Sequence, residues 1–61
     1  MELFTESEAA RILRVSVPTL KSWRQKKKGP RYVKLGKLVR YLAEDLERFA
    51  KRGIVEPDED L

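Results

Sequence analysis

The sequence contains no cysteine and no histidine. Without cysteine, the chain has no disulfide to stabilise it and no thiolate to bind a metal or attack a substrate. Without histidine, it lacks the commonest general base and the commonest metal ligand. The serines therefore have no partner for a Ser-His catalytic pair, and no G-x-x-x-x-G-K-[ST] loop occurs. We expect a binding domain that has no enzymatic activity, cofactor, metal or small-molecule substrate.

Long apolar runs are also absent, because no stretch approaches the ~18 residues of a membrane span. No signal peptide is recognisable, so we expect a cytoplasmic protein without a membrane partner. A chain of 61 residues makes one small domain. Such a domain buries roughly 60% of the surface that its unfolded chain exposes, so its stability should be marginal.

Acidic residues are missing from the centre of the chain. The first eight residues contain three acids and no base, residues 9–43 contain eleven bases and no acid, and residues 44–61 contain seven acids and three bases. The net charge of +4 therefore hides a central block of one sign. Such a block favours a polyanionic partner, and nucleic acid is the first candidate. A solvated basic surface without a partner is the alternative.

Start signals predict two short helices in the first half of the chain. Thr5-Glu6-Ser7-Glu8 fits a capping box and predicts a helix over residues 6–13. Ser16 is a favourable N-cap and Pro18 is tolerated in a first turn, so a second helix is predicted from there to Lys26 or Lys27. Helices joined by so short a turn cross steeply, which is the helix-turn-helix arrangement.

Gly29-Pro30 ends the helical pattern, and residues 31–42 have the composition of a β-hairpin. Gly36-Lys37 fits a type II′ turn, because glycine occupies the first central position. This turn pairs Leu35 with Leu38, Val33 with Arg40 and Tyr32 with Tyr41. A last helix is predicted over residues 43–52, with acids in its first turn, bases in its last turn and a weak N-cap.

These elements predict a mainly α-helical fold with a small β-hairpin, namely a winged helix-turn-helix. Two helices form the helix-turn-helix, the hairpin forms a two-stranded wing, and the C-terminal helix packs against them. The domain should span residues 1–53, and residues 54–61 should form a short, acidic, flexible tail. The predicted core consists of Leu3, Ala9, Ile12, Leu13, Val15, Leu20, Trp23, Val33, Leu46 and Phe49.

The outer face of the second helix is the predicted DNA-reading surface. With Leu20 facing the core, its outer side chains can donate hydrogen bonds and none is acidic. Gln25 suits adenine because its amide donates and accepts together, and Lys21 can reach guanine or a phosphate. Ordinary surface residues on a short helix are the alternative. The candidate contacts of this helix are Ser16, Thr19, Lys21, Ser22, Arg24, Gln25 and Lys26.

Two residues of this helix have two interpretations each. Arg24 either contacts a phosphate or braces the wing. Trp23 either stacks on DNA or packs in the core, and its spacing of three residues from Leu20 favours the core.

The hairpin is the second predicted DNA contact. Lys37 lies at its turn, flanked by Lys34 and Arg40, and a basic hairpin of this size can enter the minor groove. These three residues are the candidate contacts of the wing. The alternative is a solvated hairpin whose charge keeps its edges from pairing with other chains. Leu35 and Leu38, near the tip, either touch a neighbouring protomer or cap the core.

The order and spacing of several short segments resemble the excisionase-like, MerR-type winged helix-turn-helix family of small phage and mobile-element proteins. The resemblance covers about residues 3–50, and Arg14 departs from it because the family often has glycine in this turn. The matching segments are Glu8-Ala9-Ala10, Ile12-Leu13, Val15-Ser16, Thr19-Leu20, Trp23-Arg24, Gly29-Pro30, Tyr32-Val33-Lys34-Leu35-Gly36, Val39-Arg40-Tyr41 and Asp45-Leu46-Glu47.

The resemblance implies a protein that binds duplex DNA with its second helix in the major groove and its wing in the adjacent minor groove. Excisionases bind neighbouring sites cooperatively, bend the DNA and help an integrase to excise a phage or mobile element. The resemblance thus implies an integrase partner, head-to-tail self-association on DNA and a place in the cytoplasm of a bacterial host, on the nucleoid. The family also contains transcriptional regulators, which often carry a larger domain or a dimerisation helix.

We therefore expect a sequence-specific DNA-binding and bending accessory factor for recombination. A small transcriptional regulator that uses the same surface is the first alternative. The second is a protein-interaction module, in which the acidic tail docks on a basic partner such as an integrase.

Overall fold

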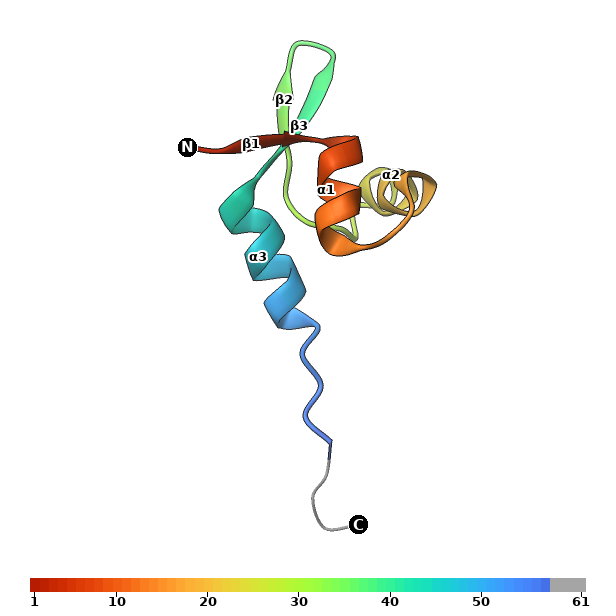
Figure 1. Ribbon diagram of the computed structural model, residues 1–61. Helices are drawn as coiled ribbons and strands as arrows, with labels where there is room; N and C mark the ends of the chain where they lie inside the picture. Colours follow the sequence, from red (N-terminus) through yellow and green to blue (C-terminus); the bar gives the residue numbers. More distant parts are fainter. Residues whose placement is uncertain (58–61) are drawn as a thin grey trace.

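The structure, a computed structural model, describes residues 1–57 and contains three helices and three strands within that range (Figure 1). A short strand, β1 (Leu3–Thr5), leads into helix α1 (Glu6–Leu13), which is followed by α2 (Val17–Gln25). The hairpin consists of β2 (Val33–Leu35) and β3 (Leu38–Leu42), and α3 (Ala43–Arg52) follows directly. The predicted winged helix-turn-helix is confirmed, and each predicted helix lies within one or two residues of its expected bounds.

The sheet has one strand more than predicted. Its order is β1-β3-β2, and all pairs are antiparallel. In β1, Leu3 pairs with Leu42 and Phe4 pairs with Tyr41. The expected two-stranded wing is confirmed as the hairpin β2–β3, and the residues before α1 add an unpredicted third strand to the sheet beside β3.

The predicted hairpin register is confirmed for two of its three pairs, Leu35 with Leu38 and Val33 with Arg40. The ladder begins at Val33, so the expected third pair lies just outside it, although the rings of Tyr32 and Tyr41 are 6.3 Å apart. Gly36 has a φ of 66° whereas the φ of Lys37 is negative. A type I′ turn needs a positive φ at both central residues, so the turn is the predicted type II′.

The caps of α1 and α2 follow the sequence signals. Thr5 Oγ1 accepts from the Glu8 N–H at 3.1 Å, and Glu8 Oε1 accepts from the Thr5 N–H at 2.8 Å, which completes the capping box. Ser16 Oγ accepts from the Thr19 N–H at 3.1 Å. The predicted weak start of α3 is also confirmed, since its N-cap Leu42 offers no side-chain hydrogen bond.

Arg14 makes the turn between α1 and α2 in a left-handed conformation, with φ 58° and ψ 42°. Its N–H donates to the Arg11 carbonyl, and the Val15 N–H donates to the Ala10 carbonyl at 3.0 Å. This is a Schellman motif with arginine at the position that usually holds glycine. Figure 1 shows α2 almost end-on beside α1, so the short turn gives the steep crossing of a helix-turn-helix.

The core is small and lies between α1, α2, α3 and the inner face of the sheet. Its buried members are Ala9, Ala10, Leu20, Tyr41 and Leu46, and Phe4, Leu13, Val15, Trp23 and Val39 pack against them. Six of the ten predicted core residues belong to this cluster. Predicted core residues Val33 and Phe49 are half-buried outside the cluster.

Two core predictions are wrong, and two buried residues of the core cluster were not predicted. Leu3 is 37% exposed because alternate residues of a strand point to opposite faces, and its face carries Val33 and Leu42 away from the helices. Ile12 is 51% exposed because the inward face of α1 centres on Ala9, Ala10 and Leu13. Ala10 and Tyr41 are the two buried members of the cluster that were not among the predicted core residues.

No helix in the described part of the chain has the length and apolar character that a membrane span requires. Residues 54–57 follow α3 as an exposed segment without helix or strand. The rest of the predicted acidic tail, residues 58–61, lies outside the described residues.

Candidate nucleic-acid interface

Helix α2 presents most of the predicted DNA contacts on one side. Leu20 is fully buried, which turns Lys21, Gln25 and Lys26 to solvent and leaves Thr19 and Ser22 half-buried. The three exposed residues lie on the outer face as predicted, whereas Thr19 and Ser22, also expected there, are only partly accessible. The exposed side chains carry donors and no negative charge, so the face can approach a phosphate backbone without electrostatic repulsion.

The N-terminus of α2 carries two hydroxyl groups that are linked to each other. Ser16 Oγ donates to Thr19 Oγ1 at 2.8 Å and also accepts from the Thr19 N–H. Because Thr19 Oγ1 acts as the acceptor, its own proton stays available for a further bond. A helix N-terminus with free donors favours an anion, so the N-terminus of α2 adds to the attraction of the basic face.

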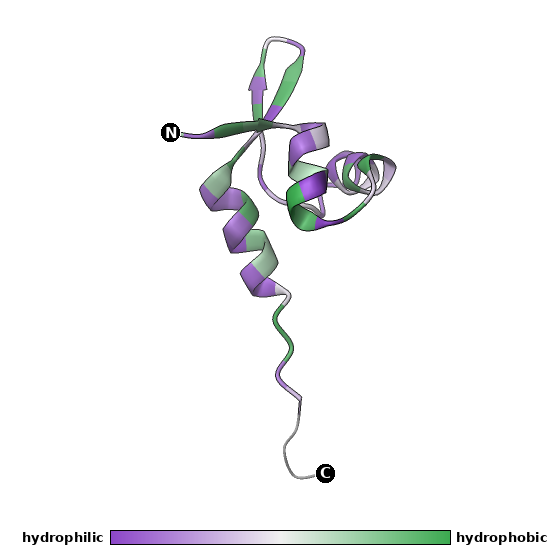
Figure 2. Cartoon of the chain, in the orientation of Figure 1, coloured by the Kyte–Doolittle hydropathy of each residue, from purple (hydrophilic) through white to green (hydrophobic). Residues whose placement is uncertain are grey.

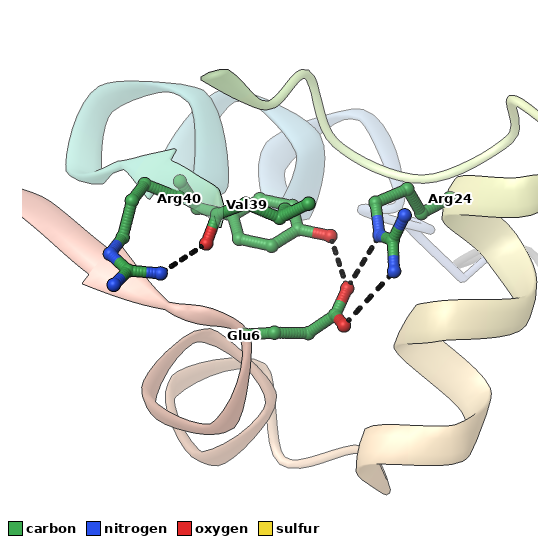
Figure 3. A network of polar contacts seen from close by, with 5 residues as sticks. Glu6, Arg24, Val39 and Arg40 are labelled. Carbon is green, nitrogen blue, oxygen red and sulfur yellow. Dashed lines mark hydrogen bonds and ion pairs between the residues drawn. The ribbon is translucent and has the colours of Figure 1, made fainter. Parts of the chain in front are cut away.

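Arg24 differs from the other candidates on α2, because it is committed to α1 (Figure 3). Its Nε donates to Glu6 Oε2 at 2.8 Å, and its Nη2 donates to Glu6 Oε1 at 3.3 Å. The same carboxylate accepts from the Tyr41 hydroxyl of β3 at 2.9 Å. The Arg24 guanidinium also lies over the Tyr32 ring, 5.9 Å from its centre. One carboxylate thus ties together α1, α2 and the base of the wing, which supports the bracing interpretation of Arg24.

The electrostatics of this network follow from its bonds. The guanidinium of Arg24 holds the pKa of Glu6 below its ordinary value, against an opposing effect of burial. Burial, together with the bond to Glu6, raises the pKa of Tyr41 well above its ordinary value. The network is therefore a carboxylate, a guanidinium and a neutral phenol at neutral pH.

The wing places Lys34 and Lys37 in solvent and Arg40 half-buried at its base. Arg40 donates from Nη1 to the Val39 carbonyl at 2.7 Å and lies opposite Thr5 of β1, so it is closer to α1 than to the wing tip. The three predicted wing contacts therefore do not form one cluster: two lie near the tip and one lies where the wing joins the sheet.

Leu35 and Leu38 are a cross-strand pair near the wing tip and are 48% and 54% exposed. Figure 2 shows hydrophobic colouring on both strands of the wing, which projects away from the helices. The suggestion that they cap the core is therefore wrong. Contact with a neighbouring protomer stays a prediction.

Trp23 packs rather than facing solvent. Its ring lies 5.6 Å from that of Phe49 on α3, inclined at 51°, and the residue contacts the core cluster. The core interpretation of Trp23 is confirmed, so α2 is anchored on its inner side by Leu20 and Trp23 together.

Comparison with known protein families identifies the family of this domain. A family model described as a helix-turn-helix domain matches residues 3–53. The chain belongs to this helix-turn-helix family. The matched region runs from β1 to the end of α3, so it includes α1 and α2, the wing and the C-terminal helix. Membership in the helix-turn-helix family indicates that the partner is DNA. No curated protein matches the chain.

Sequence reasoning did not connect Glu6, Tyr32 or Tyr41 with Arg24, which they surround. A signal for Glu6 was present, since it lies three and four residues before Ala9 and Ala10, on the inward face of α1. An acid on an inward face needs a partner, and bases are abundant in the segment that follows.

Proposed function

We propose that the protein binds duplex DNA in a sequence-specific manner, with α2 in the major groove and the wing in the adjacent minor groove. The observation that carries this proposal is the α2 surface, where exposed donors and bases stand on a helix fixed from behind by Leu20, Trp23 and Arg24. Recognition of base edges requires side chains that are held in fixed positions, and a rigid helix with an exposed face of donors provides them.

The proposed contacts divide into two classes. Gln25 and Lys21 read base edges, because an amide suits adenine and an amine suits guanine. Ser16, Thr19, Ser22 and Lys26 on the helix contact the phosphate backbone, as do Lys34, Lys37 and Arg40 of the wing. The first class sets which sequence is bound, and the second sets affinity and register.

We further propose that the DNA complex serves site-specific recombination. The protein would bind neighbouring sites head to tail, bend the DNA and assist an integrase in excising a phage or mobile element. The basis is the order of segments along the chain, which resembles that of excisionase-like proteins.

Selection of bound sites from a random duplex pool at near-physiological salt tests both the sequence-specific binding and the role in recombination. We expect enrichment of a short motif, arranged as direct repeats in phase with the DNA helix. A lone or inverted site would favour a small transcriptional regulator over a recombination factor. Absence of any enriched motif would refute sequence-specific recognition, and a search for a protein partner of the acidic tail would then come first.

A further inference from the structure

A pocket lies where α2 ends and the wing begins, and of its lining residues only Arg24 is among the predicted DNA contacts. Its volume is about 350 Å³, and its lining residues are Arg24, Lys27, Gly29, Pro30, Arg31 and Tyr32. Three of these are basic and none is acidic. A concave site with three positive side chains attracts a single anion more strongly than a flat basic surface does.

The pocket has a fixed backbone. Lys27 adopts a left-handed conformation with φ 58°, and the Lys28 N–H donates to the Trp23 carbonyl at 2.9 Å. Gly29 lies so close to Trp23 that an added Cβ would be 3.1 Å from the Trp23 Cβ. Pro30, which also lines the pocket, is buried. The turn after α2 is therefore held against the core, and its bases project from a defined frame.

Arg24 forms one wall of this pocket. Two of its nitrogens, Nε and Nη2, are held by Glu6, and the face of the guanidinium rests over Tyr32. The third nitrogen points away from Glu6 in Figure 3. A guanidinium has five N–H donors, so three remain after the two bonds to Glu6. Arg24 can therefore brace the fold and bind an anion at the same time.

We propose that this pocket binds one backbone phosphate of the DNA, on the strand that separates the major groove occupied by α2 from the minor groove occupied by the wing. The proposal rests on the proposed DNA-binding mode. The pocket lies in the loop between α2 and the wing, and one strand of the phosphate backbone lies between the two grooves of the duplex. A protein with α2 in one groove and the wing in the other would therefore place the pocket over that strand. Arg24 donates from its free edge, and Lys27 and Arg31 close on the same phosphate from the loop.

Arg31 is free to take this position. It is exposed, and its Nε is 4.0 Å from Asp45 Oδ1, at the outer limit of an ion pair. Arg48 approaches the same carboxylate oxygen at 3.6 Å. Asp45 therefore keeps a basic partner when Arg31 turns to the DNA.

The test uses the duplex selected from the random pool, with each phosphate replaced in turn by an uncharged methylphosphonate. For the wild-type protein, one position between the two groove contacts should weaken binding by roughly tenfold, the scale of a charge-assisted hydrogen bond. The Arg31→Gln variant should bind the unmodified duplex about tenfold more weakly than the wild type does. Neutralising the sensitive phosphate should then weaken its binding little further. Arg52→Gln on α3 removes the same charge from an exposed residue outside the pocket and should keep the wild-type profile.

Lys27→Gly separates binding from folding. Glycine fits the left-handed backbone at this position, so the variant should be at least as stable as the wild type while binding DNA less tightly. The proposal is overturned if Arg31→Gln retains the full penalty at every neutralised phosphate, or if its affinity equals that of Arg52→Gln. Failure of the wild-type protein to bind any duplex would instead overturn the proposed function itself.

Discussion

Replacing Glu6 with glutamine should lower the stability of the domain by about 2 kcal/mol. The Glu6 and Arg24 side chains are 16% and 17% exposed, so the ion pair is neither solvated nor fully buried. An exposed pair contributes about 0–1 kcal/mol, and removal of one partner from a buried pair costs about 3–5 kcal/mol. Glutamine keeps the shape and one acceptor, but its amide nitrogen faces a donor of Arg24. The expected cost therefore lies between the two limits.

Thermal unfolding followed by circular dichroism measures this cost. In a domain of this size, 1 kcal/mol corresponds to roughly 4–8 °C, so the Glu6→Gln variant should melt at a temperature lower by about 10 °C. Glu2→Gln makes the same chemical change at an exposed residue and serves as the control. Tyr41→Phe, which removes only the phenol bond to Glu6, should have about half the effect. A Glu6→Gln melting temperature equal to that of the control would refute the role of the network.

The same network predicts a pH dependence. The pKa of Glu6 is lowered in the folded state, chiefly by its hydrogen bond to Arg24, from an ordinary value of 4.5. The carboxylate therefore stabilises the fold above that pH, and the contribution is lost as the pH falls below it. The difference in unfolding free energy between the wild type and Glu6→Gln should shrink between about pH 6 and about pH 3. Urea unfolding of both proteins at the two pH values measures this difference in unfolding free energy. A difference that stays constant would contradict the stabilising role of the Glu6 carboxylate.

Four further predictions concern the turn residues and the DNA contacts. Arg14→Gly should raise the stability by about 0.5–1 kcal/mol, measured by urea unfolding, because glycine relieves the left-handed strain in the turn after α1. Gly36→Ala should lower it by about 1 kcal/mol, although nothing lies within 4 Å of the added Cβ, since the positive φ alone is unfavourable to alanine. In binding assays, Gln25→Ala should change sequence preference whereas Lys37→Ala should weaken binding to all duplexes alike, and equal losses from both would contradict this division. With about six phosphate contacts, log affinity should fall against log salt with a slope near −5, and a flat response would exclude binding through the basic face.

Local signals in the sequence were sufficient for the elements and their order. Thr5 and Ser16 cap their helices through bonds within three residues, and Gly36 sets its turn through its own φ. Such signals involve neighbours in the chain, so the sequence displays them directly. The exposed face of α2 follows for the same reason, because burial of Leu20 fixes the direction of its neighbours.

The parts that could not be predicted depend on contacts between distant residues. Strand β1 is three residues long, which is too short to show a period of two, and it forms only because β3 offers a free edge. The exposure of Ile12 depends on how α3 approaches α1, which helical spacing within α1 does not reveal. Glu6 meets Arg24 across 18 residues and Tyr41 across 35, so its role depends on the tertiary fold.

Arg24 joins the stability of the domain to its proposed function. A DNA-binding face concentrates like charges, which repel one another and weaken a domain whose core is already small. Glu6 offsets this by placing one negative charge against Arg24, whose guanidinium it holds through two hydrogen bonds. The pair fixes α2 against the wing before DNA arrives, so less ordering remains to be done on binding. Arginine is suited to this position and lysine is not, because only a planar group with five donors can bond a carboxylate on one edge and a phosphate on another.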